Sequence, residues 1–156
     1  MDKQMDIKNF QSKFQLVANS ISHLEIKNDF INLDESQDLV KQFSLCPIKE
    51  HIETHENYKS AGLKLKVYVA IQEKSSEKPK TFSADFTVDG VFVADAATSD
   101  AEFEEKLLIN GSAALFSIAR GFLTNVSAQV LVDGKVVLPL VNFMEFARGN
   151  KKETEQ

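Results

Sequence analysis

The sequence predicts an α+β domain in which antiparallel strands come first along the chain and a long helix follows them. Two observations support this prediction. Before residue 97, three segments alternate apolar and polar residues, and a period of two residues is typical of half-buried strands. The segment 107–132 then carries a single charged residue, Arg120, and its apolar residues recur at helical spacing.

The size and charge of the chain narrow the classes of function. Its 156 residues suit one domain, which we expect over residues 1–150, followed by a polar tail at 151–156. A net charge of −5 without a basic cluster argues against nucleic acid as a partner. The first residues contain acids and no apolar run, and Cys46 is the single cysteine, so we expect a cytoplasmic protein.

Three segments predict the strands. "GLKLKVYVAIQE" (62–73) and "TFSADFTVDGVFVADA" (81–96) alternate clearly, and the polar connector between them contains Pro79, so they predict an antiparallel hairpin. Asp89-Gly90 predicts a turn or bulge, after which "VFVADA" resumes as a further strand. The weaker alternation of "FQLVANSISHLEI" (14–26) predicts the first strand.

The segment between the first strand and the hairpin has a looser pattern. "DESQDLVKQF" (34–43) predicts a short helix capped by Asp34, and "LCPIKEHIETHENYKS" (45–60) predicts a connector. A connector of this length in a compact domain is expected to be functional or packed against another element.

The predicted helical region begins at Ser99, because Ser99 and Glu102 form a capping pattern. Asn110-Gly111 is expected to break this helix, and a second helix follows from Ser112. This second helix carries two apolar stripes, of which one would pack on the sheet and the other on another subunit: Leu115, Ile118, Ala119, Phe122 and Val126, and beside them Ala113, Phe116 and Leu123. Polar residues and glycines interrupt the run, so we favour a helix enclosed by protein over a membrane span.

Four short motifs, in order along the chain, are similar to one known family. "LFSIAR" (115–120) resembles "LFPYAR" of the SecB export chaperones, and "LPLVNF" (138–143) resembles their L-x-P-V-N-F. "DGVF" (89–92) resembles "GGIF", and "FQLVANSISHLEI" resembles the family's first strand. The resemblance covers most of residues 14–146 and is weakest over 29–60.

This resemblance implies a SecB-like fold, a four-stranded antiparallel sheet with helices packed on one face. It also implies a homo-oligomer, a dimer of dimers, held by the long helix. The interface residues would be Leu115, Phe116, Ala119, Arg120, Phe122 and Leu123. A charge buried there is costly without a partner, so Arg120 is expected to bind a carboxylate or the carbonyls at a helix end.

The resemblance further implies an ATP-independent holding chaperone for unfolded or preprotein clients, without a cofactor. The candidate client-binding residues are Phe30, Ile31, Phe43, Leu45, Phe143, Met144 and Phe146. Two alternatives remain: a module dedicated to one partner, and a SecB-like chaperone that protects the antitoxin of a toxin–antitoxin pair.

The chain departs from the family pattern at several positions. His23 and Lys27 stand where members that bind the SecA motor carry acids, which makes SecA a doubtful partner. Ser117 replaces a helix proline and predicts a straighter helix. The residues after Phe143 are few, so we expect a last helix shorter than that of the family and little of the family's longer tail.

The residue types of catalytic and metal sites are sparse. His51 and His55 are four residues apart, which would suit zinc on a helix, but the glutamate of the zinc-protease pattern is absent and a solvated connector is the favoured interpretation. Cys46 is expected to be a small packed side chain. We therefore expect neither a metal nor an enzyme.

Overall fold

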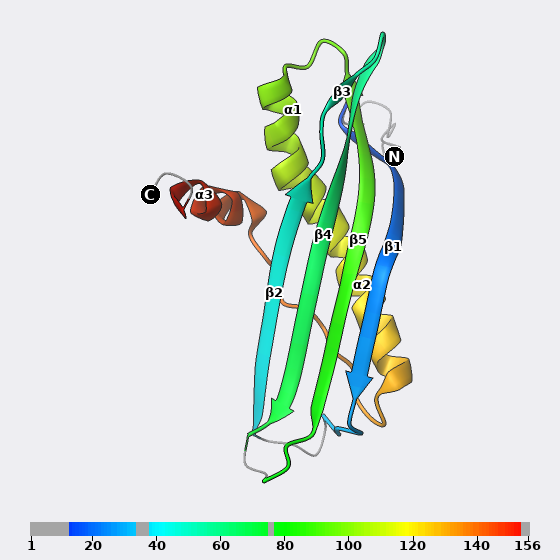
Figure 1. Cartoon of the computed structure of the whole chain (residues 1–156), viewed down its shortest axis with the longest axis vertical. Helices are drawn as coiled ribbons and strands as arrows, with labels where there is room; N and C mark the ends of the chain where they lie inside the picture. Colours follow the sequence, from blue (N-terminus) through cyan, green and yellow to red (C-terminus); the bar gives the residue numbers. More distant parts are fainter. Residues whose placement is uncertain (1–12, 34–37, 75–76, 154–156) are drawn as a thin grey trace, which may run out of the picture.

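The computed structural model describes residues 13–33, 38–74 and 77–153, and shows an antiparallel sheet crossed on one face by a long helix (Figure 1). The strands are β1 (Gln15–Asn28), β2 (Leu39–Lys49), β3 (Glu53–Thr54), β4 (Tyr58–Glu73) and β5 (Thr81–Asp95). The helices are α1 (Asp100–Lys106), the π-helical η2 (Leu107–Gly111), α2 (Ser112–Val130) and α3 (Phe143–Glu153). The sheet order is β1-β5-β4-β2, and β3 pairs with β4. The predicted α+β class is confirmed, with five strands in place of four.

Strand β2 corrects the prediction of a helix over residues 34–43. Asp34 lies outside the described residues, but Leu39–Lys49 is a strand in continuous register with β4, from Leu39 opposite Glu73 to Lys49 opposite Leu63. Leu39 and Leu45 pack against the core through this pairing. Long-range pairing thus overrides the local helical pattern, and the predicted connector 45–60 is largely strand.

Strand β5 runs without interruption through Asp89-Gly90, so the predicted turn or bulge is wrong. The glycine serves close packing instead, because a Cβ at Gly90 would lie 2.7 Å from Cδ2 of Leu115 in α2. The register shifts occur in β1, where Val17 and Ser22 are the extra residues.

The core lies between the sheet and the helix. Alternate side chains of β4 and β5 are buried on this face: Ala61, Leu63, Leu65, Val67, Val69 and Ile71, and Phe82, Ala84, Phe86, Val88 and Phe92. From the helical side, Phe103, Leu107, Leu115 and Leu123 are almost fully buried against them. Burial on one face of each strand explains the alternation in the sequence.

Residues 100–130 form one continuous helix, so the break expected at Gly111 is wrong. The predicted start is confirmed, because the Ser99 side chain accepts a hydrogen bond from the Glu102 N–H. A Cβ at Gly111 would lie 3.1 Å from Leu63, so the glycine lets the π-helical turn approach the sheet. By length and composition this helix would suffice to cross a membrane, but many of its apolar residues pack on the sheet, which accounts for the absence of charge on that face.

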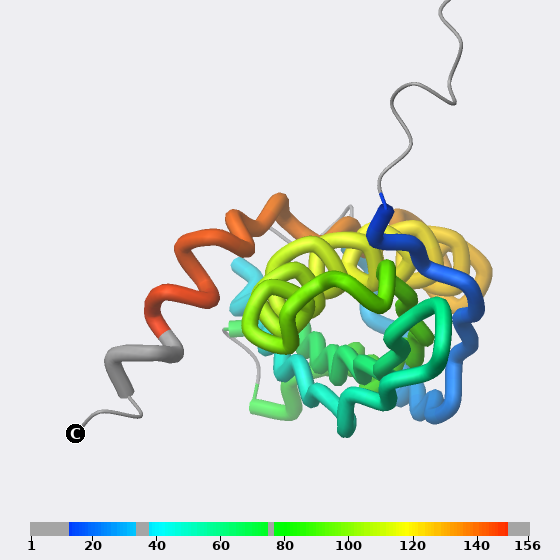
Figure 2. The backbone as a smooth tube through the Cα atoms, turned by 90° about the horizontal axis from the view of Figure 1, so that it is seen from above, coloured from blue at the N-terminus to red at the C-terminus, as the bar shows by residue number. Residues whose placement is uncertain are grey.

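After α2 the chain returns along the helix before α3 projects to one side of the sheet and helix layers (Figure 2). Arg120 Nε donates to the Leu138 carbonyl at 2.7 Å, so the partner of this arginine is a backbone carbonyl. The Phe143 ring contacts Phe116 at 5.4 Å and Phe146 at 5.9 Å between centroids, and these contacts anchor the start of α3.

Replacing Ser127 by alanine is expected to reduce the free energy of unfolding by about 1–3 kcal/mol. The fully buried Ser127 hydroxyl accepts the Val136 N–H at 2.8 Å, and alanine would leave that donor buried without a partner. Chemical denaturation measures the change. The matched control is Ser117→Ala, because the exposed Ser117 hydroxyl only donates to the Ala113 carbonyl; equal losses in both variants would contradict the prediction.

Candidate functional site

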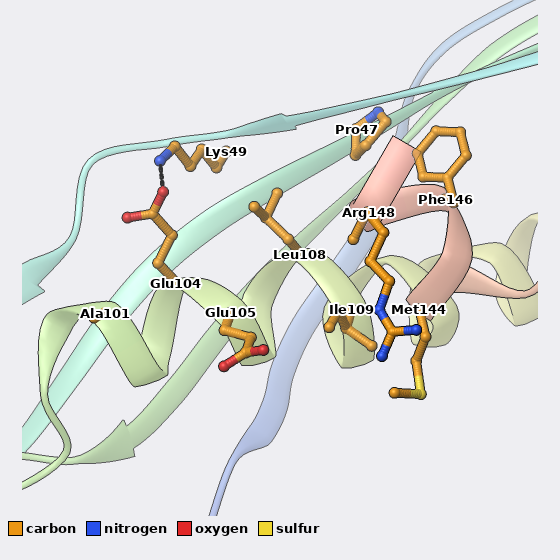
Figure 3. A pocket seen from close by; sticks show the side chains of 11 residues that line it. Pro47, Lys49, Ala101, Glu104, Glu105, Leu108, Ile109, Met144, Phe146 and Arg148 are labelled. Carbon is orange, nitrogen blue, oxygen red and sulfur yellow. Dashed lines mark hydrogen bonds and ion pairs between the residues drawn. The ribbon is translucent and has the colours of Figure 1, made fainter. Parts of the chain in front are cut away.

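A groove of about 740 Å³ opens where the end of β2, the first turns of the long helix and α3 meet (Figure 3). Strand β2 contributes Pro47 and Lys49, and α3 contributes Met144, Phe146, Ala147 and Arg148. The helix contributes Ala101, Glu104, Glu105, Leu108 and Ile109. Three elements that are distant in the sequence therefore build one surface.

The centre of the groove is apolar and its borders are charged. Leu108 points from the helix toward β2, and Phe146 lies beside Pro47 (Figure 3). Lys49 forms an ion pair with Glu104 across one end of the groove. Met144 is 53% exposed, so a flexible apolar side chain is available to a ligand. An apolar strip with charged borders suits an extended, partly apolar polypeptide.

The structure brings together four of the seven predicted client-binding residues. Met144 and Phe146 line the groove. Phe43 and Leu45 lie on the helix side of β2, in the same row as Pro47, and Phe43 is 43% exposed. This row extends the apolar surface of the groove along the strand.

The other three predicted client-binding residues lie elsewhere. Ile31 is fully buried in the core and Phe143 is 6% exposed, so both stabilise the subunit in this conformation. Phe30 is 74% exposed but follows β1 at the end of the sheet where β5 begins, away from Lys49 at the opposite end of β2.

The sequence does not predict the helical wall of the groove, which is formed by residues of the first turns of the helix 100–130. Leu108 and Ile109 belong to the long apolar run and were assigned to the helix without a surface role. Arg148 lies in the C-terminal segment, where the sequence pattern predicts no charged border of a groove. The pattern "MEFAR", in which apolar and charged residues alternate closely after the last proline, is the signal that points to a surface helix here.

The residues predicted for a subunit interface lie mainly in the subunit's own core. Leu115, Phe116, Ala119 and Leu123 are buried beneath the helix. Arg120 and Phe122 are half-buried, and the Phe122 ring packs 5.2 Å from Phe86. The surface of α2 that is turned away from the sheet presents a shallow hollow of about 480 Å³. Two of the predicted interface residues, Phe116 and Arg120, line this hollow, together with Ser117, Gly121, Thr124, Asn125, Val137 and Leu140. Leu140 is 83% exposed at its border.

The outer face of the sheet is mixed in charge. Lys27 lies 2.9 Å from Glu25, and this hydrogen bond lowers the pKa of the Glu25 carboxyl and raises the pKa of Lys27. His23 lies 3.9 Å from Asp85 on the neighbouring strand. The absence of SecA binding stays a prediction.

The two histidines do not share a helix face, because the predicted connector is not helical. His51 is exposed before β3, whereas His55 stacks on Tyr58 and its Nε2 lies 3.1 Å from Ser60 Oγ. Within residues 13–33, 38–74 and 77–153, no cluster of three or more His, Cys, Asp or Glu residues is arranged to hold a metal. Cys46, which was expected to be packed, is exposed on the outer face of β2.

No protein-family model and no curated protein matches the chain. Among solved structures, the chain is similar to a SecB-like chaperone from Mycobacterium tuberculosis in complex with a ChAD peptide from the HigA1 antitoxin. The TM-score is 0.64 at 13% identity, over 82% of this chain and 90% of that chain. A protein of unknown function from Streptococcus agalactiae is also similar, with a TM-score of 0.46 at 11% identity over 81% and 97% of the two chains. The similarity to the mycobacterial chaperone shows that the chain has a SecB-like fold, as its motifs predict.

Proposed function

From this SecB-like fold we propose that the protein is an ATP-independent holding chaperone. It binds apolar segments of unfolded polypeptides, preproteins among them, in the groove between β2, the helix 100–130 and α3. The observation that carries the proposal is the apolar groove lined by Pro47, Leu108 and Met144 between charged borders, together with the row Phe43, Leu45 and Pro47 that leads to it along β2.

Binding of this kind uses apolar contact area and needs no cofactor or nucleotide. Met144 can adapt to different side chains, and the neighbouring Phe146 offers an aromatic surface. The charged borders, among them the Lys49–Glu104 ion pair, limit self-association of the apolar strip. The single cysteine, which cannot form a disulfide within the chain, favours action in the cytoplasm.

A second candidate function is the protection of one dedicated partner. The similar chaperone from Mycobacterium tuberculosis was solved with a peptide from an antitoxin, which favours a cognate antitoxin segment as an occupant of a groove of this type. The two candidates differ in selectivity, because a dedicated chaperone would discriminate between apolar segments that a general chaperone holds equally.

We also propose that two copies meet through the outer surface of α2 and that such dimers pair. Small and polar side chains at Ser117, Gly121 and Asn125 let a second helix approach closely. The exposed Val137 and Leu140 beside them would be covered in the same contact.

The double variant Phe43→Ser, Met144→Ser is expected to lose most of the protection that the wild type gives a chemically denatured test protein against aggregation. Light scattering during dilution from denaturant, without ATP, measures this protection. Both side chains are exposed, so their replacement removes contact area for clients while the subunit core stays intact. Phe143 is left unchanged because its ring anchors α3.

The matched control is Val40→Ser, Val91→Ser, which changes two similarly exposed apolar residues on the opposite face of the sheet. This control is expected to protect as well as the wild type. If the groove variant protects the test protein as well as the wild type does, the proposal is wrong. A wild type that protects a single cognate partner and no unrelated protein would establish the dedicated function.

A further inference from the structure

Strand β2 forms one end of the sheet and has only β4 as a neighbour among the described residues. The strand at the other end, β1, is interrupted by two register shifts, at Val17 and Ser22. Bulges of this kind disturb the regular row of hydrogen-bonding groups on an edge. Strand β2 pairs with β4 without any shift from Leu39 to Lys49, so its free edge is regular.

The register identifies which backbone groups of β2 face solvent. Two hydrogen bonds continue the ladder beyond its ends, from the Glu50 N–H to the Gly62 carbonyl and from the Lys74 N–H to the Asp38 carbonyl. Both bonds use an even-numbered residue on the β2 side. In an antiparallel pair the bonded residues alternate, so the even-numbered residues of β2 bond to β4 and the odd-numbered residues point to the free edge.

Pro47 agrees with this assignment. It is odd-numbered, and proline is tolerated in an edge strand where its nitrogen faces away from the neighbouring strand. The free N–H groups in the middle of the edge therefore belong to Lys41, Phe43 and Leu45. The same odd-numbered residues place their side chains on the helix side of the sheet, in the row that leads to the groove.

We propose that the free edge of β2 binds an extended client segment as an additional strand. The inference rests on the proposed function and specifies how the client is held. The backbone of the client would exchange hydrogen bonds with Lys41, Phe43 and Leu45, and its alternate side chains would continue the apolar row beside Phe43 and Leu45 toward the groove. Pro47 has no N–H to donate and weakens the ladder at that end.

The charges on β2 favour a client over a second copy of this strand. Its charged residues are Lys41 and Lys49, and it contains no acid. Two β2 edges side by side would bring lysines of the two strands together with no acid on either strand, although Lys49 is paired with Glu104 of α1. Edge lysines are a known protection against such pairing. The favoured client segment is therefore apolar at every second position, with an acidic residue near Lys41.

The probe is a fluorescent peptide of alternating leucine and serine with one terminal aspartate, and fluorescence anisotropy measures its affinity. Leu45→Pro removes an outward N–H and leaves the bonds to β4 in place, whereas Leu45→Ala removes the side chain alone. We expect Leu45→Pro to bind the peptide about tenfold more weakly than Leu45→Ala, at a similar melting temperature. Ser44→Pro removes an inward N–H and is expected to lower the melting temperature instead.

Two measurements on the wild-type protein make the test independent of the variants. A peptide with identical side chains, methylated on alternate backbone nitrogens, is expected to bind about tenfold more weakly. Hydrogen exchange of the Lys41, Phe43 and Leu45 amides is expected to slow when the unmodified peptide binds.

Several outcomes would overturn the proposal. One is that the wild type holds clients, binds the methylated and the unmodified peptide equally, and keeps fast exchange at these amides. This result would exclude the added strand but not the chaperone function. Another is slow exchange at the same amides without peptide, dependent on protein concentration, which would show pairing between copies. Failure of the wild type to hold any unfolded protein would instead remove the proposed function itself.

Discussion

Replacing Phe92 by alanine is expected to lower the free energy of unfolding by about 3–5 kcal/mol. Phe92 is 1% exposed, and its ring stacks on Phe14 with centroids 5.1 Å apart. The ring also lies close to two glycines: a Cβ at Gly90 would lie 3.0 Å from the ring, and a Cβ at Gly111 would lie 3.4 Å from it. The two glycines beside the ring have no side chains that could move into the space that alanine would leave.

Chemical denaturation of Phe92→Ala and Val91→Ala tests this prediction. Val91 is the adjacent residue of β5, its side chain lies on the opposite face of the sheet, and it is 42% exposed. Its replacement is expected to change the free energy of unfolding by about 0.5 kcal/mol. A similar loss in both variants would show that the sheet is not covered on one face only.

The central strands and the helix start could be predicted because each has a local cause. One face of β4 and β5 is buried and the other meets solvent, so Leu63, Leu65 and Val67 alternate visibly with Lys64 and Lys66. The start of the helix depends on one hydrogen bond between neighbours, from the Glu102 N–H to Ser99. Each of these signals is contained in a few neighbouring residues, so it can be recognised without the tertiary structure.

Strand β2 could not be predicted because an edge strand is poorly buried on both faces. Val40 is 49% exposed on one face and Phe43 is 43% exposed on the other, so the apolar residues show no period of two. The turn expected at Gly90 and the helix break expected at Gly111 are wrong for another reason. Glycine serves turns, helix ends and close packing alike, and the neighbour that decides, Leu115 or Leu63, is distant in the sequence.

The candidate site was predicted in part. Phe43, Leu45, Met144 and Phe146 were recognised because they are apolar residues in segments without a core pattern. Ile31 and Phe143 satisfy the same criterion, yet tertiary packing buries them. The surface role of Leu108 and Ile109 could not be predicted, because apolar residues on an apolar helix have the same pattern as core residues. The π-helical turn that carries them has no sequence signature.

Replacing Gly121 by arginine is expected to reduce the solution mass, from near four times the 17.5 kDa of one chain to that of a smaller species. Gly121 is exposed on α2, and a Cβ there meets nothing within 4 Å, so arginine fits the isolated subunit and favours the helix. In the proposed contact between copies, the same side chain fills the space of the facing helix and brings an unpaired charge into it. Light scattering after size exclusion measures the mass.

Gly149→Arg is the matched control, because Gly149 is an exposed glycine of α3 whose Cβ would likewise meet nothing within 4 Å. It is expected to keep the wild-type mass. Aspartate at Phe116 or Phe122 would not serve this purpose, since both rings pack inside the subunit and the charge would destabilise the fold itself. A wild type that elutes as a monomer, or a Gly121→Arg variant of unchanged mass, would exclude the outer surface of α2 as the contact between subunits.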